Sequence, residues 1–171
     1  IPKRDWSSDV CSSDLLIDKW ILSELNTLIK TVDQSLENFD SQAAGNAIGQ
    51  FIDDLSNWYV RRSRRRFWDG EATALTTLYI CLKNLSLMMA PMVPFISEHV
   101  WQVLVRVNET SVAESIHLAN FPTSNEKLID QKLSQQVALS RRIVELGRAA
   151  RAQSAVKVRQ PLSRALISAT G

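Results

Sequence analysis

Apolar residues recur at every third or fourth position along most of the chain, which is the spacing of amphipathic helices. In the first of these segments, Leu22, Leu25 and Leu28 follow one another at three-residue steps. The pattern stops at residues that end helices, among them Gly70 and Pro91. It predicts five helices, at about residues 16–38, 42–68, 72–90, 93–105 and 125–151.

Two glycines interrupt the second of these helices. Gly45 and Gly49 are four residues apart and therefore lie on one face of the helix. A glycine inside a helix costs about 1 kcal/mol relative to alanine. We expect a close crossing with another helix at this face to offset that cost.

The second helix also carries a dense run of arginines, five within residues 61–66. We take Leu55 as the centre of the apolar stripe and advance by about 100° per residue. Arg64 then points directly away from the core, and Arg61 and Arg65 lie together on one flank. Guanidinium groups bind phosphate in a bidentate manner and stack on bases, so these three side chains suit a nucleic-acid partner.

The same count returns Arg62 and Arg66 to the buried stripe. A buried charge without a partner is very costly, so both residues are candidates for structural ion pairs. The carboxylates of Asp53, Asp54 and Glu98 are the partners that we expect for them.

Composition favours an all-α bundle. The chain has 171 residues, of which 45% are hydrophobic, and only five glycines and five prolines. This is enough for one globular core, and the strand-and-turn spacing of a β protein is missing from the sequence. We expect about five helices and a short extended C-terminal segment.

Three regions follow from the same pattern. Residues 1–15 are rich in Ser and Asp and lack periodicity, so we interpret them as a non-native or disordered leader. We expect the helical domain to cover residues 16–155. Residues 156–171 would then be the start of a following junction region that is cut off.

Charge is distributed unevenly along the chain. Residues 1–126 contain 11 Lys/Arg against 16 Asp/Glu, whereas residues 127–171 contain 9 against 2. The basic C-terminal part and the arginine run lie in an otherwise acidic chain. This uneven distribution of charge favours a polyanionic partner over a neutral ligand.

Catalytic and metal-binding patterns are missing from the sequence. Cys11 and Cys81 lack metal-ligand spacing and indicate a reducing, cytoplasmic environment. The two histidines, His99 and His117, are too few for a histidine cluster. The apolar run at residues 85–90 is too short to cross a bilayer. We therefore expect no catalytic residue, no metal and no membrane partner.

Residues 56–68 read Ser-Asn-Trp-Tyr-Val-Arg-Arg-Ser-Arg-Arg-Arg-Phe-Trp. This segment resembles the signature helix in the anticodon-binding domain of isoleucyl-tRNA synthetases. Residues 87–101 resemble a segment that several class I synthetases share, and residues 156–162 resemble a further isoleucyl-specific motif. The resemblance covers residues 16–167.

The resemblance implies a fragment of an enzyme that uses ATP and Mg²⁺ to join isoleucine to its tRNA. The fragment would hold the anticodon stem and loop beside the catalytic domain of the same parent chain. The sequence carries neither the His-Ile-Gly-His-like nor the Lys-Met-Ser-Lys-Ser-like motif of the catalytic domain, so we expect no cofactor in this part. The predicted RNA-binding residues are Arg61, Arg64, Arg65, Trp68, Arg148, Arg151, Lys157 and Arg159.

Two other classes of function fit the residues less well. A non-catalytic helical module that binds proteins predicts scattered charge and no salt-sensitive binding. A basic bundle that binds nucleic acids without specificity would explain the charge but not the resemblance. A DNA-binding bundle lacks a short helix-turn-helix pair in this sequence.

Overall fold

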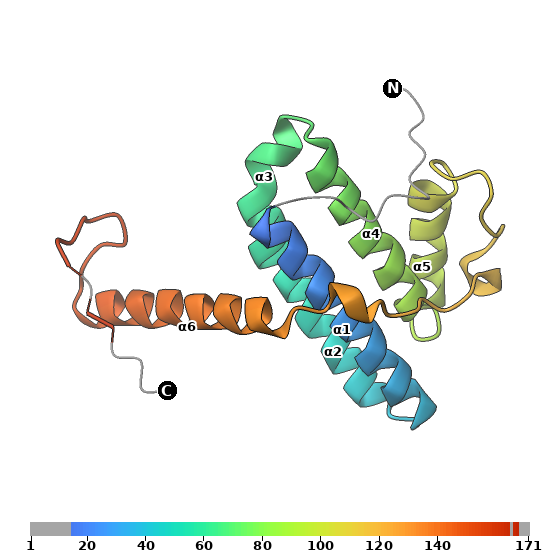
Figure 1. Ribbon diagram of the computed structural model, residues 1–171, viewed down its shortest axis with the longest axis horizontal. Helices are drawn as coiled ribbons and strands as arrows, with labels where there is room; N and C mark the ends of the chain where they lie inside the picture. Colours follow the sequence, from blue (N-terminus) through green and yellow to red (C-terminus); the bar gives the residue numbers. More distant parts are fainter. Residues whose placement is uncertain (1–14, 165, 168–171) are drawn as a thin grey trace. The chain divides into compact units, whose positions relative to one another are not determined.

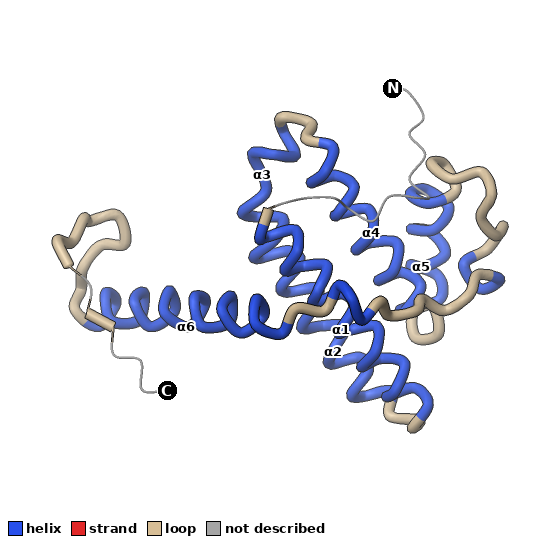
Figure 2. The backbone as a smooth tube through the Cα atoms, viewed as in Figure 1, coloured by secondary structure: helices blue, strands red, loops and turns tan. Residues whose placement is uncertain are grey.

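The computed structural model describes residues 15–164, 166 and 167, and its regular elements are all helical (Figures 1 and 2). The all-α class predicted from the sequence is confirmed. The elements are α1 (Leu16–Glu37), α2 (Ser41–Asp53), η1 (Asp54–Val60), α3 (Arg61–Trp68), α4 (Ala72–Met89), α5 (Pro94–Val100), η2 (Trp101–Val105), η3 (Ile116–Leu118), η4 (Glu126–Leu128) and α6 (Gln131–Gln153). Here η1 and η2 are π-helical, and η3 and η4 are 3₁₀-helical.

The predicted leader, except for Leu15, lies outside the described residues. The extended segment expected near the C-terminus lies partly outside them as well. Its described residues, Arg164, Leu166 and Ile167, do not form a strand.

The chain divides into two compact units, one ending at Asp130 and the other beginning at Gln131. The first unit contains every helix from α1 to η4, and the second contains α6 and the residues after it. The division falls inside the range 16–155, which the sequence predicts as one domain.

The fifth long helix begins at Gln131 and not near residue 125, as the sequence predicts. The preceding residues are held by hydrogen bonds to α1 and cannot join the helix. The backbone N–H of Asn125 donates to Asn26 Oδ1 at 2.8 Å, and the N–H of Asp130 donates to Ser23 Oγ at 2.8 Å. Polar groups buried on α1 therefore set the start of α6.

Helices α1 and α2 form an antiparallel pair (Figure 1). Between them, Phe39 has a φ of 58°, in the left-handed region, and Asp40 caps α2 by accepting a hydrogen bond from the N–H of Ala43 at 2.9 Å. The tight turn lets the apolar stripes of both helices meet, and Ile21, Val32 and Ile48 are buried there.

Among the described residues, α4 alone is long and apolar enough to cross a membrane by length and composition. Its side chains Tyr79, Cys81, Leu85 and Met88 are buried inside the first unit. Because α4 also contacts α1, α3 and α5, these four residues belong to the helical core.

Arg66 joins the ends of three helices in the first unit. Its Nη1 and Nη2 donate to the two carboxylate oxygens of Asp18 at 2.7 Å each. Its Nε and Nη2 donate to the two oxygens of Glu71 at 2.9 and 2.7 Å. Asp18 lies at the start of α1, Arg66 near the end of α3, and Glu71 immediately before α4. We call these three residues the arginine clamp.

Burial and charge reinforce the clamp. Asp18 is fully buried, and its hydrogen bonds raise the pKa of the Arg66 guanidinium, which stays charged. Burial also raises the pKa of Tyr59, and the neighbouring Asp18 carboxylate raises it further. The neutral Tyr59 hydroxyl donates to the carbonyl oxygen of Ala74 at 3.2 Å. The last turn of α3 and the end of η1, which leads into α3, are thus bonded to neighbouring helices.

The close helix crossing expected at Gly45 and Gly49 is wrong. A Cβ atom added at either position would meet no heavy atom of the described residues within 4 Å, and both glycines are exposed. Within the described structure, no close helix contact at these two glycines offsets their low helix propensity.

Replacing Gly49 by alanine should therefore raise the free energy of unfolding by about 0.5–1 kcal/mol, because the helix gains propensity without a clash. Urea unfolding followed by circular dichroism measures the change. Gly70→Ala is the control with the opposite sign, because Gly70 has a φ of 68°. A loss of stability in Gly49→Ala would contradict the open environment of this position.

Replacing Arg66 by methionine should lower the free energy of unfolding by about 3–5 kcal/mol, because the charge of Asp18 is left buried without its cation. The matched control is Arg65→Met on the exposed face of α3, where a change within about 0.5 kcal/mol is expected. Equal losses in the two variants, measured by urea unfolding, would exclude the clamp as the main constraint.

Acid should weaken the clamp through Glu71. Hydrogen bonds from Arg66 and Thr73 lower the pKa of Glu71 from 4.5 to about 2. Because its pKa is lower in the folded state, ionised Glu71 stabilises the folded protein above pH 4.5, and this stabilisation is lost as the pH falls towards 2.

We therefore expect Glu71→Gln to be less stable than the wild type near neutral pH and to converge with it below pH 4.5. Urea unfolding across this range measures the difference. Glu37→Gln, at the end of α1, is the control. A stability difference that stays constant down to pH 2 would contradict the assignment.

Candidate nucleic-acid interface

The outward face of α3 carries four of the residues that the sequence predicts as RNA contacts. Arg61, Arg64, Arg65 and Trp68 are all exposed, Trp68 by 78%. Arg61 lies three residues before Arg64 and four before Arg65, and Trp68 lies four residues after Arg64 and three after Arg65, so the four side chains are neighbours on the helix surface. At about 100° per residue they lie in an arc of about 100° opposite the buried Ser63. We call these four residues the arginine face.

Arg62 does not lie on the buried stripe, and its assignment as a structural ion-pair residue is wrong. It is exposed, and Ser63 occupies the buried position instead. The cause is η1, because a π-helical turn holds one more residue than an α-helical turn. Each residue after η1 therefore takes the angular position that a uniform α-helix would give to its predecessor.

The guanidinium of Arg62 lies over the ring of Trp58, with Cζ 5.1 Å from the ring centroid. A cation at this distance is attracted by the electrons of the indole face. The contact links η1 to the first turn of α3. Arg62 lies on a different flank of the helix from the arginine face.

Arg66 does lie in a structural ion pair, but with other partners than the sequence suggests. Its partners are Asp18 and Glu71. Of the three carboxylates proposed for the arginines (Asp53, Asp54 and Glu98), the last two have other roles. Asp54 accepts a hydrogen bond from Gln50 at 3.3 Å, and Glu98 accepts one from the N–H of Ile116 at 3.0 Å.

Asp18 is the residue of the clamp that sequence reasoning missed. A signal for it exists, because Asp18 precedes Ile21 by three residues and Leu25 by seven, which places it on the apolar stripe of α1. A carboxylate on such a stripe needs a buried cation. Glu71 gives no comparable signal, because it lies in the turn before α4.

The second unit carries the other predicted contacts. Arg148, Lys157 and Arg159 are exposed. Arg151 is partly buried, and its Nη1 donates to the carbonyl oxygens of Lys157 at 3.0 Å and Gln160 at 2.8 Å. Arg151 thus holds the loop that carries the two basic residues.

The chemistry of these surfaces suits binding. Exposed guanidinium groups donate in pairs to phosphate oxygens, and an exposed indole offers a flat surface on which a base can stack. Within residues 15–164, 166 and 167, no group of three or more His, Cys, Asp or Glu side chains is placed to hold a metal ion. A polyanion with unstacked bases fits this chemistry.

Comparison with known proteins agrees with the chemistry of these surfaces. Residues 18–166 match the family model described as the anticodon-binding domain of tRNA ligase. Three similar curated proteins are isoleucine–tRNA ligases, from Thermobifida fusca (60% identical, 91% of this chain and 15% of the relative), Cutibacterium acnes (56%, 90% and 14%) and Streptomyces avermitilis (53%, 91% and 15%).

The chain spans about 15% of the length of these relatives, and the region it matches does not include a catalytic domain. The family model, in contrast, extends over most of the chain, from Asp18 in α1 to Leu166. The chain belongs to the family of anticodon-binding domains of tRNA ligases.

Proposed function

We propose that the chain binds the anticodon stem and loop of isoleucine tRNA as part of an isoleucine–tRNA ligase. The arginine face on α3 carries this proposal. It combines an exposed indole with three exposed guanidinium groups that have no ion-pair partner among the described residues. The helix that carries them is bonded to α1 through Arg66 in its last turn, and Tyr59, just before its start, is bonded to α4. The names of the relatives support the choice of isoleucine.

The arginine face binds RNA through two kinds of contact. Arg61, Arg64 and Arg65 donate to phosphate oxygens of the stem and loop. Trp68 stacks on a base that is splayed out of the loop, because single-stranded bases are recognised by stacking on aromatic rings. The clamp holds the helix in place, so that little conformational freedom is lost on binding.

The second unit adds contacts to the phosphate backbone. Arg148, Lys157 and Arg159 are exposed cations and contribute phosphate contacts. Arg151 contributes by holding the loop of Lys157 and Arg159 through backbone carbonyls.

The remaining parts of the reaction belong to the parent protein. We propose that ATP, Mg²⁺ and isoleucine bind in a catalytic domain outside these 171 residues, and that the enzyme works in the cytoplasm. The chain itself supplies binding energy and orientation for the tRNA, and no residue of it reacts.

Replacing Arg61, Arg64 and Arg65 together by glutamine should weaken binding to isoleucine tRNA by about tenfold per arginine, since hydrogen bonds to charged groups contribute about 1.5–3 kcal/mol each. The slope of log K against log salt should become shallower by about 2–3 units, because each lost phosphate contact removes about 0.7–0.9 from it. Filter binding across a salt series measures both quantities.

The matched control removes the same charge elsewhere, in Lys19→Gln, Lys30→Gln and Arg106→Gln together. It should change affinity little. Equal weakening by both triple variants, with no preference for isoleucine tRNA over an anticodon-swapped tRNA, would indicate unspecific binding by a basic bundle. Absence of salt-sensitive binding would favour a protein-interaction module.

A further inference from the structure

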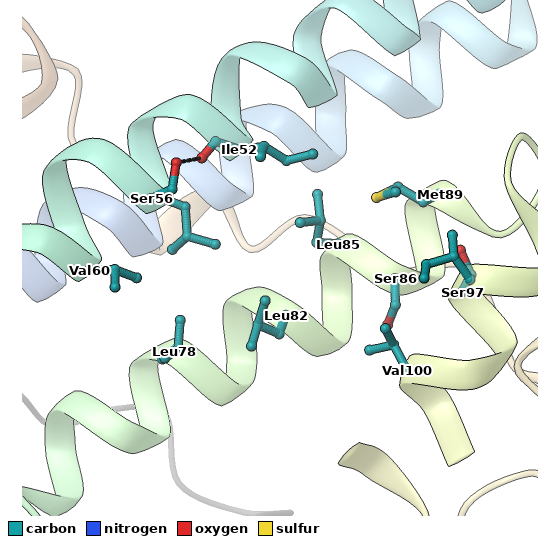
Figure 3. A pocket seen from close by; sticks show the side chains of 12 residues that line it. Ile52, Ser56, Val60, Leu78, Leu82, Leu85, Ser86, Met89, Ser97 and Val100 are labelled. Carbon is teal, nitrogen blue, oxygen red and sulfur yellow. Dashed lines mark hydrogen bonds between the residues drawn. The ribbon is translucent and has the colours of Figure 1, made fainter. Parts of the chain in front are cut away.

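Two buried polar side chains on α1, Ser23 and Asn26, have no part in the arginine face or in the clamp. Much of the first unit is lined by apolar side chains, as in the groove between α2–η1 and α4, where none of the 12 lining residues carries a charge (Figure 3). Ser23 is fully buried, and Asn26 is only 6% exposed. Buried polar groups are costly unless they form hydrogen bonds, so the partners of these two side chains indicate their role.

The partners lie in residues 120–130, which we call the strap. The strap follows residues that pack against a buried hydrophobic cluster, and it ends where α6 begins. Asn26 Oδ1 accepts a hydrogen bond from the N–H of Asn125, and Ser23 Oγ accepts one from the N–H of Asp130, each at 2.8 Å. The two bonds lie on either side of η4, so this part of the strap is held at both ends.

Hydrogen bonds fix the register of the strap on α1. The Oγ of Ser124 adds a third bond, which it donates to the carbonyl oxygen of Asn26 at 2.8 Å. The side chain of Asn26 is itself oriented, because its Nδ2 donates to the carbonyl oxygen of Leu22 at 2.8 Å. Hydrogen bonds depend on angle as well as on distance. They therefore determine which residue of the strap lies at which place on α1, whereas an apolar contact would allow the strap to slide.

The bond at Asp130 fixes the point on α1 from which the second unit starts, because Gln131 is the next residue. The charge of the chain changes sign at nearly the same point. Residues 1–126 contain 11 Lys/Arg against 16 Asp/Glu, whereas residues 127–171 contain 9 against 2. The strap is thus held where the acidic part of the chain passes into the basic part.

The length of the free linker determines how strongly two binding units reinforce each other. Their effective concentration falls with about the 3/2 power of this length. With the strap anchored, one peptide bond separates the last held residue from α6. With the strap released, the linker grows to about 11 residues, with an r.m.s. length of about 20 Å. Release would lower the affinity of the two units for one ligand without removing any contact to it.

We propose that Ser23 and Asn26 are positioning residues for tRNA binding. They hold the strap on α1 and so keep the linker between the arginine face and the basic second unit short. Neither side chain touches the RNA in this role, because both act through the backbone of the strap. This inference rests on the proposed function, in which both units contact the same tRNA.

A Gly/Ser insertion of about 12 residues tests this role. Between Asp130 and Gln131, it lies beyond the anchors and should weaken binding of the 171-residue chain to isoleucine tRNA by about tenfold. Between Asn120 and Phe121, it lies before the anchors and should change the affinity by less than about twofold, because the start of the second unit stays held. Filter binding measures both affinities. Equal effects of the two insertions would overturn the inference.

Removing the anchors should abolish the difference between the insertions. Ser23→Ala together with Asn26→Ala should weaken tRNA binding by about tenfold. The insertion after Asn120 should then weaken it by about threefold more, because the free linker is doubled. Thr31→Ala is the matched control, since this hydroxyl donates to the carbonyl oxygen of Thr27 within α1 at 2.9 Å, and the affinity should stay unchanged. Wild-type affinity in the variant without anchors would overturn the inference.

The salt dependence separates a longer linker from lost contacts. A longer linker removes no phosphate contact, so the slope of log K against log salt should be the same in the wild type, the insertion variants and the variant without anchors. A purely structural role of the two side chains would not keep this slope while making the effect of the insertion before the anchors depend on them. A slope that becomes shallower as the affinity falls would overturn the inference.

Amide exchange tests the anchors without RNA. The N–H groups of Asn125 and Asp130 should exchange at least about tenfold faster in the variant without anchors than in the wild type, because their acceptors are gone. Thr31→Ala should leave both exchange rates unchanged. Equal exchange in the wild type and in the variant without anchors would overturn the inference.

The two proposals fail in different ways. If the triple glutamine variant of the arginine face loses tRNA affinity but the two insertions have equal effects, the inference about the strap alone fails. If tRNA binding does not depend on these arginines while the amides of Asn125 and Asp130 respond to removal of the anchors, the proposed function fails at the arginine face.

Discussion

The ion pair of Arg66 with Asp18 and Glu71 is the constraint on which the placement of α3 depends. This helix has eight residues, five of them arginines, and a free helix of that length and charge would not be stable in water. The clamp bonds its last turn to the starts of α1 and α4, and the Tyr59 hydroxyl bonds the end of η1, which leads into α3, to α4. The remaining guanidinium groups can then be exposed to solvent while α3 stays helical.

One run of identical side chains thus has three roles. Arg66 stabilises the fold, Arg62 covers the ring of Trp58, and the other arginines remain available to a ligand. Composition alone cannot separate these roles, because every member has the same charge and shape. The environment of each side chain separates them, through the buried carboxylate of Asp18 and the angular positions set by η1.

Much of the fold could be predicted from apolar spacing. The five long helical segments of the sequence correspond to the observed helices, because the apolar stripes are continuous and Gly70 and Pro91 end them clearly. The exposure of Arg61, Arg64 and Arg65 could be predicted too. The position of Arg62 could not, because no residue type marks a π-helical turn. The late start of α6 also escaped prediction, because it depends on hydrogen bonds to Ser23 and Asn26, which lie far away in the sequence.

The π-helical turn of η1 has a consequence for how this region can change in evolution. A π-helical turn holds one residue more than an α-helical turn, so the loss of one residue between Asp54 and Val60 would restore an ordinary helix. Arg66 anchors the far end, and the side chains of α3 would therefore keep their directions. Single-residue insertions and deletions are usually confined to loops, but here a helix interior can absorb one while the arginine face keeps its direction.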